Sequence, residues 1–169
     1  MSEPEKSLYM TVLMTPDLAN FSGKVHGGAI LKLLDQVAFA CAARYAKSYV
    51  VTLSLDQVTF KAPVNVGELV SFRAHVNYVG KSSMEVGVKV IAEDLHTKEK
   101  RHTNSCYFTM VAVDDDSNPI PVPPLELKTE FEKKLYEAAV MRKEMREEAV
   151  RRNRKITADI PDYNTDVSR

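Results

Sequence analysis

The segment from Gly28 to about Ala46 restricts the fold more than any other, because it is apolar on almost every side of a helix. Hydrophobic residues recur every three or four positions, which predicts a helix, and leucine, phenylalanine and alanine fill most of its remaining surface. Its only acid is Asp35, in the middle. A helix with so little polar surface has to be covered by other parts of the chain.

The residues after this helix supply the cover, since apolar and polar residues alternate there as in half-buried antiparallel strands. The clearest alternation covers residues 70–78, 84–90 and 105–112. A shorter strand is expected at Tyr9–Leu13, before the helix, and another near Val51–Leu55, after it. The sequence therefore predicts an α+β fold in which a curved antiparallel five-stranded sheet wraps around one long central helix.

Two details of the connections are also predicted. The apolar residues of Val51–Leu55 have one parity, whereas Val58 and Phe60 have the opposite one, which indicates a bulge at Asp56-Gln57 that bends the strand around the helix. The connections APVNVGE and VGKSS are short enough for hairpin-like turns.

The C-terminal part of the chain changes character after residue 118. The stretch PIPVPPLE is too rich in proline to pair in a sheet, and from about Glu126 to Arg152 the chain is charged and helix-favouring. We therefore expect a first domain at 7–122, a linker and charged amphipathic helix at 123–153, and a mobile tail at 154–169.

Charge and composition exclude several classes of protein. The 23 basic and 23 acidic side chains balance, so no global field favours nucleic acid or an anionic membrane. No apolar run approaches the roughly 20 residues of a membrane span, and the first ten residues do not resemble a signal peptide. Cys41 and Cys106 lie in apolar patterns without CxxC spacing, as buried free thiols do. We expect a cytoplasmic protein that binds neither nucleic acid nor membrane.

Asp35 is the first candidate for chemistry, because burying a carboxylate is costly unless the carboxylate serves a purpose. A carboxylate kept away from water becomes a stronger base and can activate a water molecule. The structural alternative is an ion pair with Lys32 or with an arginine of another subunit. The helical pattern alone does not choose between these two interpretations.

A second candidate is the sequence HGG, from His26 to Gly28, where a loop becomes the helix. Glycines at a helix N-terminus let a ligand approach backbone N–H groups, which could polarise a carbonyl oxygen. The same glycines could simply permit a tight turn. Asn20, earlier in this loop, could orient water or substrate through its amide, although loop asparagines commonly form Asx turns.

The stretch VGKSSMEVGVKV at 79–90 is a third candidate, because it combines a turn, two hydroxyl groups and two lysines. This chemistry suits a phosphate or a pantetheine amide, but an ordinary hairpin has the same composition. Phe60 and Lys61 are most simply a core aromatic residue and a surface cation. The four histidines lack metal-binding spacing, and no GxSxG, P-loop or dinucleotide motif occurs, which disfavours a metal site and several enzyme classes.

Four segments are specific enough to compare with known families: MTPDLANFSGKVHGGAILKLLDQVAFACAARYA, VTFKAPVNVGE, GKSSMEVGVKV and RHTNSCYFTMVAV. Together they resemble the hot-dog-fold acyl-CoA thioesterases of the cytosolic, or brain-type, acyl-CoA hydrolase group, particularly its compact single-domain bacterial members. The resemblance runs from about Tyr9 to Leu125. Its most specific part is PDxxNxxGxxHGG, followed by an acid seven residues after the last glycine.

The resemblance implies hydrolysis of a fatty acyl-CoA to free CoA and a carboxylic acid, without a metal or organic cofactor. It implies a catalytic pair, Asn20 and Asp35, contributed to each site by opposite chains, with Asp35 acting as base or nucleophile. It implies substrate and oxyanion contacts at His26, Gly27 and Gly28. It further implies that two hot dogs join their sheets and that three such dimers form a homohexamer. The CoA contacts that it implies are Phe60, Lys61, Gly80, Lys81, Ser82, Ser83, Met84 and Lys89.

Two other functions are compatible with these residues. A hot-dog hydratase or dehydratase would act on acyl thioesters, but it needs a histidine beside a carboxylate, and only His26 stands near the right place. A non-catalytic acyl-CoA sensor would bind its ligand and leave it intact. A nucleotide effector site between subunits also fits the resemblance, without assigned residues, and the preferred acyl chain length is not encoded in any readable pattern.

Overall fold

The computed structural model describes residues 5–158 and residue 160. The chain divides into two compact units, one ending at Glu126 and the other beginning at Leu127. The first unit contains β1 (Ser7–Leu13), the short 3-10 helix η1 (Pro16–Leu18), α1 (Gly27–Ala46), β2 (Tyr49–Leu55), β3 (Leu69–Val79), β4 (Ser83–Glu93) and β5 (Lys100–Val113). The second unit contains α2 (Glu130–Thr157).

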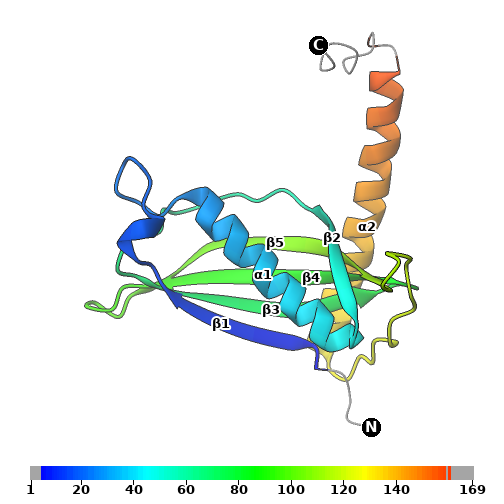
Figure 1. Ribbon diagram of the computed structural model, residues 1–169, viewed down its shortest axis with the longest axis horizontal. Coiled ribbons are helices and arrows are strands. Elements are labelled where there is room, and N and C mark those ends of the chain that lie inside the picture. Colours follow the sequence, from blue (N-terminus) through cyan, green and yellow to red (C-terminus); the bar gives the residue numbers. More distant parts are fainter. Residues whose placement is uncertain (1–4, 159, 161–169) are drawn as a thin grey trace. The chain divides into compact units, whose positions relative to one another are not determined.

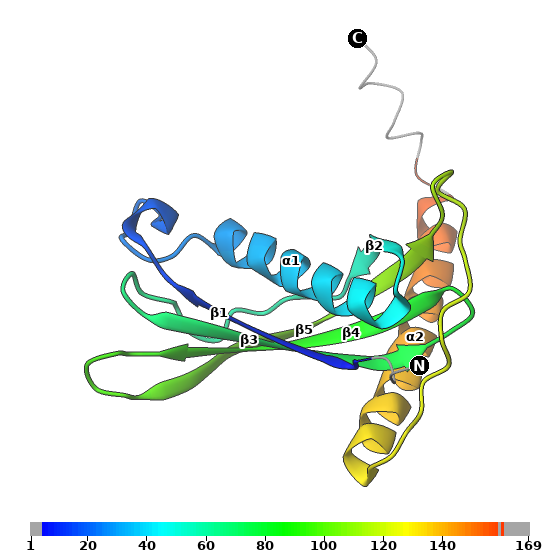
Figure 2. The ribbon, with the colours of Figure 1, turned by 60° about the horizontal axis from the view of Figure 1, so that its bottom comes forward.

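All five strands form one antiparallel sheet in the order β1-β3-β4-β5-β2. The strands β1 and β2 are therefore its two edges. Helix α1 lies along one face of the sheet (Figure 1), and the sheet curves around that helix (Figure 2). The predicted α+β hot-dog fold, with five strands around one long helix, is confirmed.

The core lies between α1 and the sheet. Alternate residues of β3 and β4 are buried on the side of the helix, among them Phe72, Val76, Val86 and Val90. They pack with the buried face of α1, which consists of Ile30, Leu34, Val37, Ala38 and Cys41. The opposite face of α1, with Asp35 and Phe39, is exposed in the single chain. The sheet therefore covers only one side of the helix. The apolar sequence suggested cover around its whole circumference.

The connection between β2 and β3 differs from the prediction. The register shift in β2 lies between Thr52 and Ser54, not at Asp56-Gln57, and the residues from 56 to 68 belong to no regular strand. This connection is not a hairpin, because β2 pairs with β5 whereas β3 pairs with β1 and β4. The alternation of apolar and polar residues reveals a strand but not the strands with which it pairs. The sequence pattern therefore could not show that the chain crosses the sheet between β2 and β3. The predicted β3–β4 hairpin at VGKSS is present.

The charged helix near the C-terminus is also present, with later bounds than expected. Thr129 caps α2, and its side chain and that of Glu132 form a reciprocal capping box, which explains the start at Glu130. The helix ends at Thr157, so residues 154–157 are helical, although we expected them in the mobile tail. Of that tail, residues 159 and 161–169 lie outside the described part of the chain.

Candidate active site

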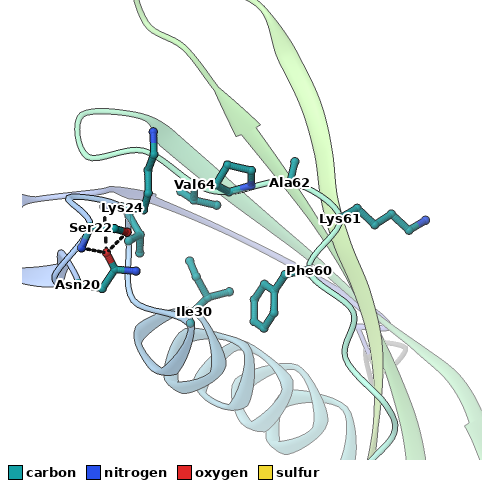
Figure 3. Close-up of a pocket in the computed structure, with 11 residues that line it drawn as sticks. Asn20, Ser22, Lys24, Ile30, Phe60, Lys61, Ala62 and Val64 are labelled. Carbon is teal, nitrogen blue, oxygen red and sulfur yellow. Dashed lines mark hydrogen bonds between the residues drawn. The ribbon is translucent and has the colours of Figure 1, made fainter.

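A pocket of about 390 Å³ opens at the N-terminal end of α1 (Figure 3). One wall is the loop before α1, with Asn20, Ser22 and Lys24, and the other is the irregular segment that begins at Phe60 and ends at Val64. Gly27, in the first turn of α1, lies between these walls. The fold therefore brings together four residues that the sequence singled out: Asn20, Gly27, Phe60 and Lys61.

Asn20 builds the turn that forms the first wall. Its side-chain oxygen Oδ1 accepts hydrogen bonds from the Ser22 N–H at 2.9 Å, the Ser22 hydroxyl at 2.7 Å and the Lys24 N–H at 3.1 Å. Its amide nitrogen Nδ2 makes no hydrogen bond within the described part of the chain. The Asx-type turn is thus real, and it leaves the NH₂ group of the same side chain available to a ligand.

The first turn of α1 presents one backbone donor to the pocket. His26 is the N-cap residue, and its Nδ1 accepts the Gly28 N–H at 3.0 Å, so that N–H already has a partner. The Gly27 N–H has none among the residues described. A Cβ added to Gly27 would lie 3.8 Å from the Phe60 ring. Phe60 is 44% exposed, so it forms part of this pocket and is not a core residue.

Asp35 lies two turns further along α1, about 12 Å from Gly27 at the usual helical rise, and it is not among the residues that line the pocket. Its side chain is exposed in the single chain. The Thr52 hydroxyl donates a hydrogen bond to Asp35 Oδ1 at 2.7 Å. Within the described residues, Lys32 forms no ion pair with it. Sequence reasoning missed Thr52, whose only signal was a hydroxyl in a mostly apolar strand.

Most of the remaining residues predicted to bind CoA lie at the other end of the sheet. The turn that contains Gly80, Lys81 and Ser82 follows the far end of β3, an 11-residue strand that spans roughly 33 Å. Met84 is fully buried in the core, so this chain alone offers it to no ligand. Lys89 is exposed and lies opposite Arg73 on the outer face of the sheet. Lys61 borders the pocket, with its side chain extending outward (Figure 3).

A partly buried ion pair contacts the pocket wall at the Pro63 carbonyl, and sequence reasoning missed it as well. Both terminal nitrogens of Arg101 donate to the two carboxylate oxygens of Glu68, at 2.5 and 2.6 Å, and Glu68 is 4% exposed. Burial by itself raises the pKa of Glu68, but the hydrogen bonds from Arg101 and from the Asn65 N–H outweigh it and lower the pKa below the ordinary value. The carboxylate is therefore ionised at neutral pH.

Metal and thiol chemistry find little support at this site. No group of three or more His, Cys, Asp or Glu side chains in the described residues is arranged to hold a metal ion. Cys41 and Cys106 are buried and free, and burial raises the pKa of each thiol to about 12, so neither is a nucleophile at neutral pH. No helix among the described residues has the length and apolar character that crossing a bilayer requires.

Comparisons with known proteins show the family to which the chain belongs. Residues 22–99 match the thioesterase superfamily. The chain is 55% identical over 139 residues to protein VdlD of Helicobacter pylori, covering 82% of this chain and 79% of that protein. It is 36% identical to YkhA of Bacillus subtilis, an uncharacterized acyl-CoA thioester hydrolase, with coverage of 82% of this chain and 80% of that protein. It is 34% identical to the rat cytosolic acyl coenzyme A thioester hydrolase, where the match covers 74% of this chain and 33% of the rat protein.

Solved structures show the same fold. The acyl-CoA hydrolase of Staphylococcus aureus, solved with butyryl coenzyme A and coenzyme A, superposes with a TM-score of 0.80 at 32% identity and covers 90% of this chain and 93% of that one. A hexameric acyl-CoA thioesterase superposes with a TM-score of 0.80 at 38% identity, with coverage of 95% and 98%. This chain therefore belongs to the thioesterase superfamily, within its group of hot-dog acyl-CoA thioester hydrolases.

The S. aureus enzyme offers one more comparison. Its structure has also been solved with an asparagine, an aspartate or a threonine changed to alanine. In chain order these three positions are 15 and 17 residues apart. Asn20, Asp35 and Thr52 have the same order and the same spacing in this chain.

Proposed function

We propose that this protein hydrolyses acyl-CoA thioesters to free CoA and a carboxylic acid. Membership of the acyl-CoA thioester hydrolase group supports the reaction class. The observation that carries the proposal is the hydrogen bond from Thr52 to Asp35, because with Asn20 it completes a set of three polar side chains in the order and spacing of the residues altered in the S. aureus enzyme.

In the proposed mechanism, Asp35 accepts a proton from a water molecule as the water oxygen attacks the thioester carbonyl carbon. Thr52 holds Oδ1 of the carboxylate at 2.7 Å, which orients the other oxygen toward the water. The amide NH₂ of Asn20 positions the water, and the Gly27 N–H stabilises the oxyanion. The C–S bond then breaks, and the leaving CoA thiolate takes the proton from Asp35, which gives free CoA and the carboxylic acid and restores the carboxylate. A thiol pKa near 8.5 makes the thiolate a good leaving group without a strong general acid.

No step of this route needs a metal or an organic cofactor. The reaction has water and an acyl-CoA as its only substrates, and the proposed base, donors and leaving group are all accounted for. A cytoplasmic location, and the lack of nucleic-acid and membrane partners, stay predictions from the composition.

A second copy of the chain completes the proposed site, because Asp35 does not line its own chain's pocket. Strand β2 is an edge of the sheet, and it exposes apolar side chains, with Tyr49 at 64% and Leu53 at 68%. Such an edge favours pairing with another strand. A twofold axis would pair β2 with the β2 of the second copy in antiparallel fashion. Asp35 of one copy would then face Asn20 of the other, as the family resemblance implies.

The same twofold symmetry would bring the β3–β4 turn of one copy to the pocket end of the other. Antiparallel pairing reverses the second copy, so the pocket end of one sheet meets the β3–β4 turn of the other. Lys81, which is exposed on that turn, would then stand near the CoA that enters its partner's pocket. We propose three such dimers in a hexamer, in line with the hexameric acyl-CoA thioesterase of the same fold.

The proposal is tested by measuring CoA release with a thiol-reactive dye across acyl chain lengths. Asp35→Asn removes the base and Asn20→Asp removes the NH₂ donor while keeping an oxygen for the Asn20 turn. Each change should lower kcat by about 10²- to 10⁴-fold. Asp115→Asn, which makes the same exchange of acid for amide on an exposed loop, should not change it. Hydration of an enoyl-CoA without thiol release would identify a hydratase instead, and binding without turnover would identify a sensor.

Subunit mixing tests whether the two residues come from opposite chains. Asn20→Ala and Asp35→Asn subunits are each expected to be inactive, and the two are co-refolded in equal amounts. In a hybrid dimer one site carries both changes and the other carries neither, so random mixing should restore about a quarter of the wild-type activity. If both residues of a site came from the same chain, every site would stay defective and mixing would restore nothing.

A further inference from the structure

One wall of the pocket, segment 60–65, belongs to no named helix or strand. Three backbone hydrogen bonds hold it in place. The Lys61 N–H donates to the Thr103 carbonyl of β5 and the Val25 N–H to the Val64 carbonyl, both at 2.9 Å, and the Glu68 N–H donates to the Asn65 carbonyl at 3.3 Å. Irregular segments with few such bonds open locally at low cost. The shape of this wall therefore depends on the other contacts that the segment makes.

Arg101, in β5, makes one of these contacts directly and another through Glu68. Its Nη2 donates to the Pro63 carbonyl at 2.7 Å and to Glu68 Oε2 at 2.6 Å, while Nη1 donates to Glu68 Oε1. The same Glu68 Oε2 accepts the Asn65 N–H at 2.7 Å. One planar guanidinium thus holds the middle of the segment directly and its end through Glu68. Arg101 itself does not line the pocket.

The hydrogen bonds continue to the opposite wall. Lys24 Nζ donates to Asn65 Oδ1 at 2.6 Å. The Lys24 backbone pairs with Asn20, because the Asn20 N–H donates to the Lys24 carbonyl at 2.6 Å and the Lys24 N–H donates to Asn20 Oδ1 at 3.1 Å. An unbroken chain of hydrogen bonds therefore joins Arg101 to the turn that carries the proposed NH₂ donor.

We infer that Arg101 is a positioning residue that sets the separation of the two pocket walls and thereby the affinity for the acyl-CoA substrate. The inference rests on the proposed function, since it assumes that CoA thioesters enter this pocket. A merely structural ion pair would behave differently. Its loss would lower the stability and the amount of folded enzyme but would leave the KM of the folded fraction unchanged.

Arg101→Lys is the decisive variant. It keeps a positive charge beside Glu68, but a single ammonium cannot reproduce the fork that serves Glu68 and the Pro63 carbonyl together. We expect the KM for the best acyl-CoA substrate to rise roughly tenfold, as for a displaced binding group, with little change in kcat. The matched control is Lys100→Gln, which removes the neighbouring ion pair between Lys100 and Glu93, 3.3 Å long and largely exposed on the lysine side. It should leave KM unchanged.

Hydrogen exchange of the full-length protein separates this inference from the proposed function. In Arg101→Lys, amides of segment 60–65 should exchange faster than in the wild type, and in Lys100→Gln they should not. Unchanged exchange in this segment, or a lower melting temperature with an unchanged KM, would overturn the positioning role. A wild-type protein that releases no CoA would overturn the proposed function, and the exchange measurement would still decide whether Arg101 fixes the walls.

Discussion

The two ends of the sheet differ in how they are built. At one end the pocket lies between an asparagine-centred turn and the irregular segment 60–65, which Arg101 and Glu68 tie to β5 and β3. At the other end, β3 and β4 are joined by the short turn around Lys81, closed by a hydrogen bond from the Gly80 N–H to the Ser83 carbonyl at 2.8 Å. The pocket end needs side-chain contacts to hold its shape, whereas the hairpin end needs only its backbone ladder.

This difference shows where single substitutions should matter. An irregular wall loses its shape when one buried side chain is removed, because no ladder of backbone hydrogen bonds replaces it. A hairpin keeps its shape through many backbone bonds and tolerates changes at its tip. The hairpin end takes part in the proposed reaction only when a second copy of the chain brings it to a pocket. Substitutions at the hairpin end should therefore change activity less than substitutions at the pocket end, and only through electrostatic interactions.

The largest expected effect is on stability, at the pocket end. Glu68→Gln leaves the Arg101 guanidinium, only 28% exposed, without its charged partner, and should lower the free energy of unfolding by about 3 kcal/mol. Ser83→Ala at the hairpin end should change it by no more than about 0.5 kcal/mol. Urea unfolding of both variants measures the comparison. Equal losses would mean that the two ends are held in the same way.

Thr52, in β2, should matter almost as much, through catalysis. Thr52→Val keeps the shape of the side chain but removes the donor to Asp35 Oδ1, so the carboxylate loses its fixed orientation. We expect kcat to fall roughly 100-fold. Thr52→Ser, which keeps a hydroxyl, should retain most of the activity. A fully active Thr52→Val enzyme would show that the hydrogen bond has no part in the reaction.

The pH dependence of the free energy of unfolding should also distinguish the pocket end from the hairpin end, because Glu68 lies at the pocket end. The pKa of Glu68 is lower in the folded chain than its ordinary value of 4.5, so the folded protein favours the ionised form. This contribution is complete above about pH 4.5 and is lost as the pH falls through the lowered pKa. Unfolding free energies from pH 7 to pH 3 should therefore fall more steeply in the wild type than in Glu68→Gln. Parallel curves would contradict the assignment of this acid sensitivity to Glu68.

The smallest effect is expected at the hairpin tip. Lys81→Ala should raise the KM for acyl-CoA about threefold at low salt, as for the loss of one exposed ionic contact of up to about 1 kcal/mol. The increase should shrink at high salt because the interaction is screened. Lys98→Ala, another exposed lysine in a loop of the same sheet, serves as the control. An equal effect of both changes would remove the hairpin end from the proposed CoA site.

The elements themselves could be predicted because their signals are local. The period of three to four residues marks α1, and the period of two marks β3, β4 and β5, since each depends on the few residues around it. The motif around Asn20, Gly27 and Asp35 indicated the family for the same reason. The order of the strands and the crossing from β2 to β3 could not be predicted in this way, because strand pairing joins residues far apart in the chain.

The sequence by itself thus determined the fold class, the position of the loop that begins the site, and the family. Only the tertiary structure decided that Gly28 donates to His26 and leaves Gly27 as the available donor, that Thr52 holds Asp35, and that Arg101 and Glu68, 33 residues apart, fix one wall of the pocket. The physical reason is that hydrogen bonds between side chains depend on distances of a few tenths of an ångström. Such distances are set by how distant segments pack, and no local pattern records them.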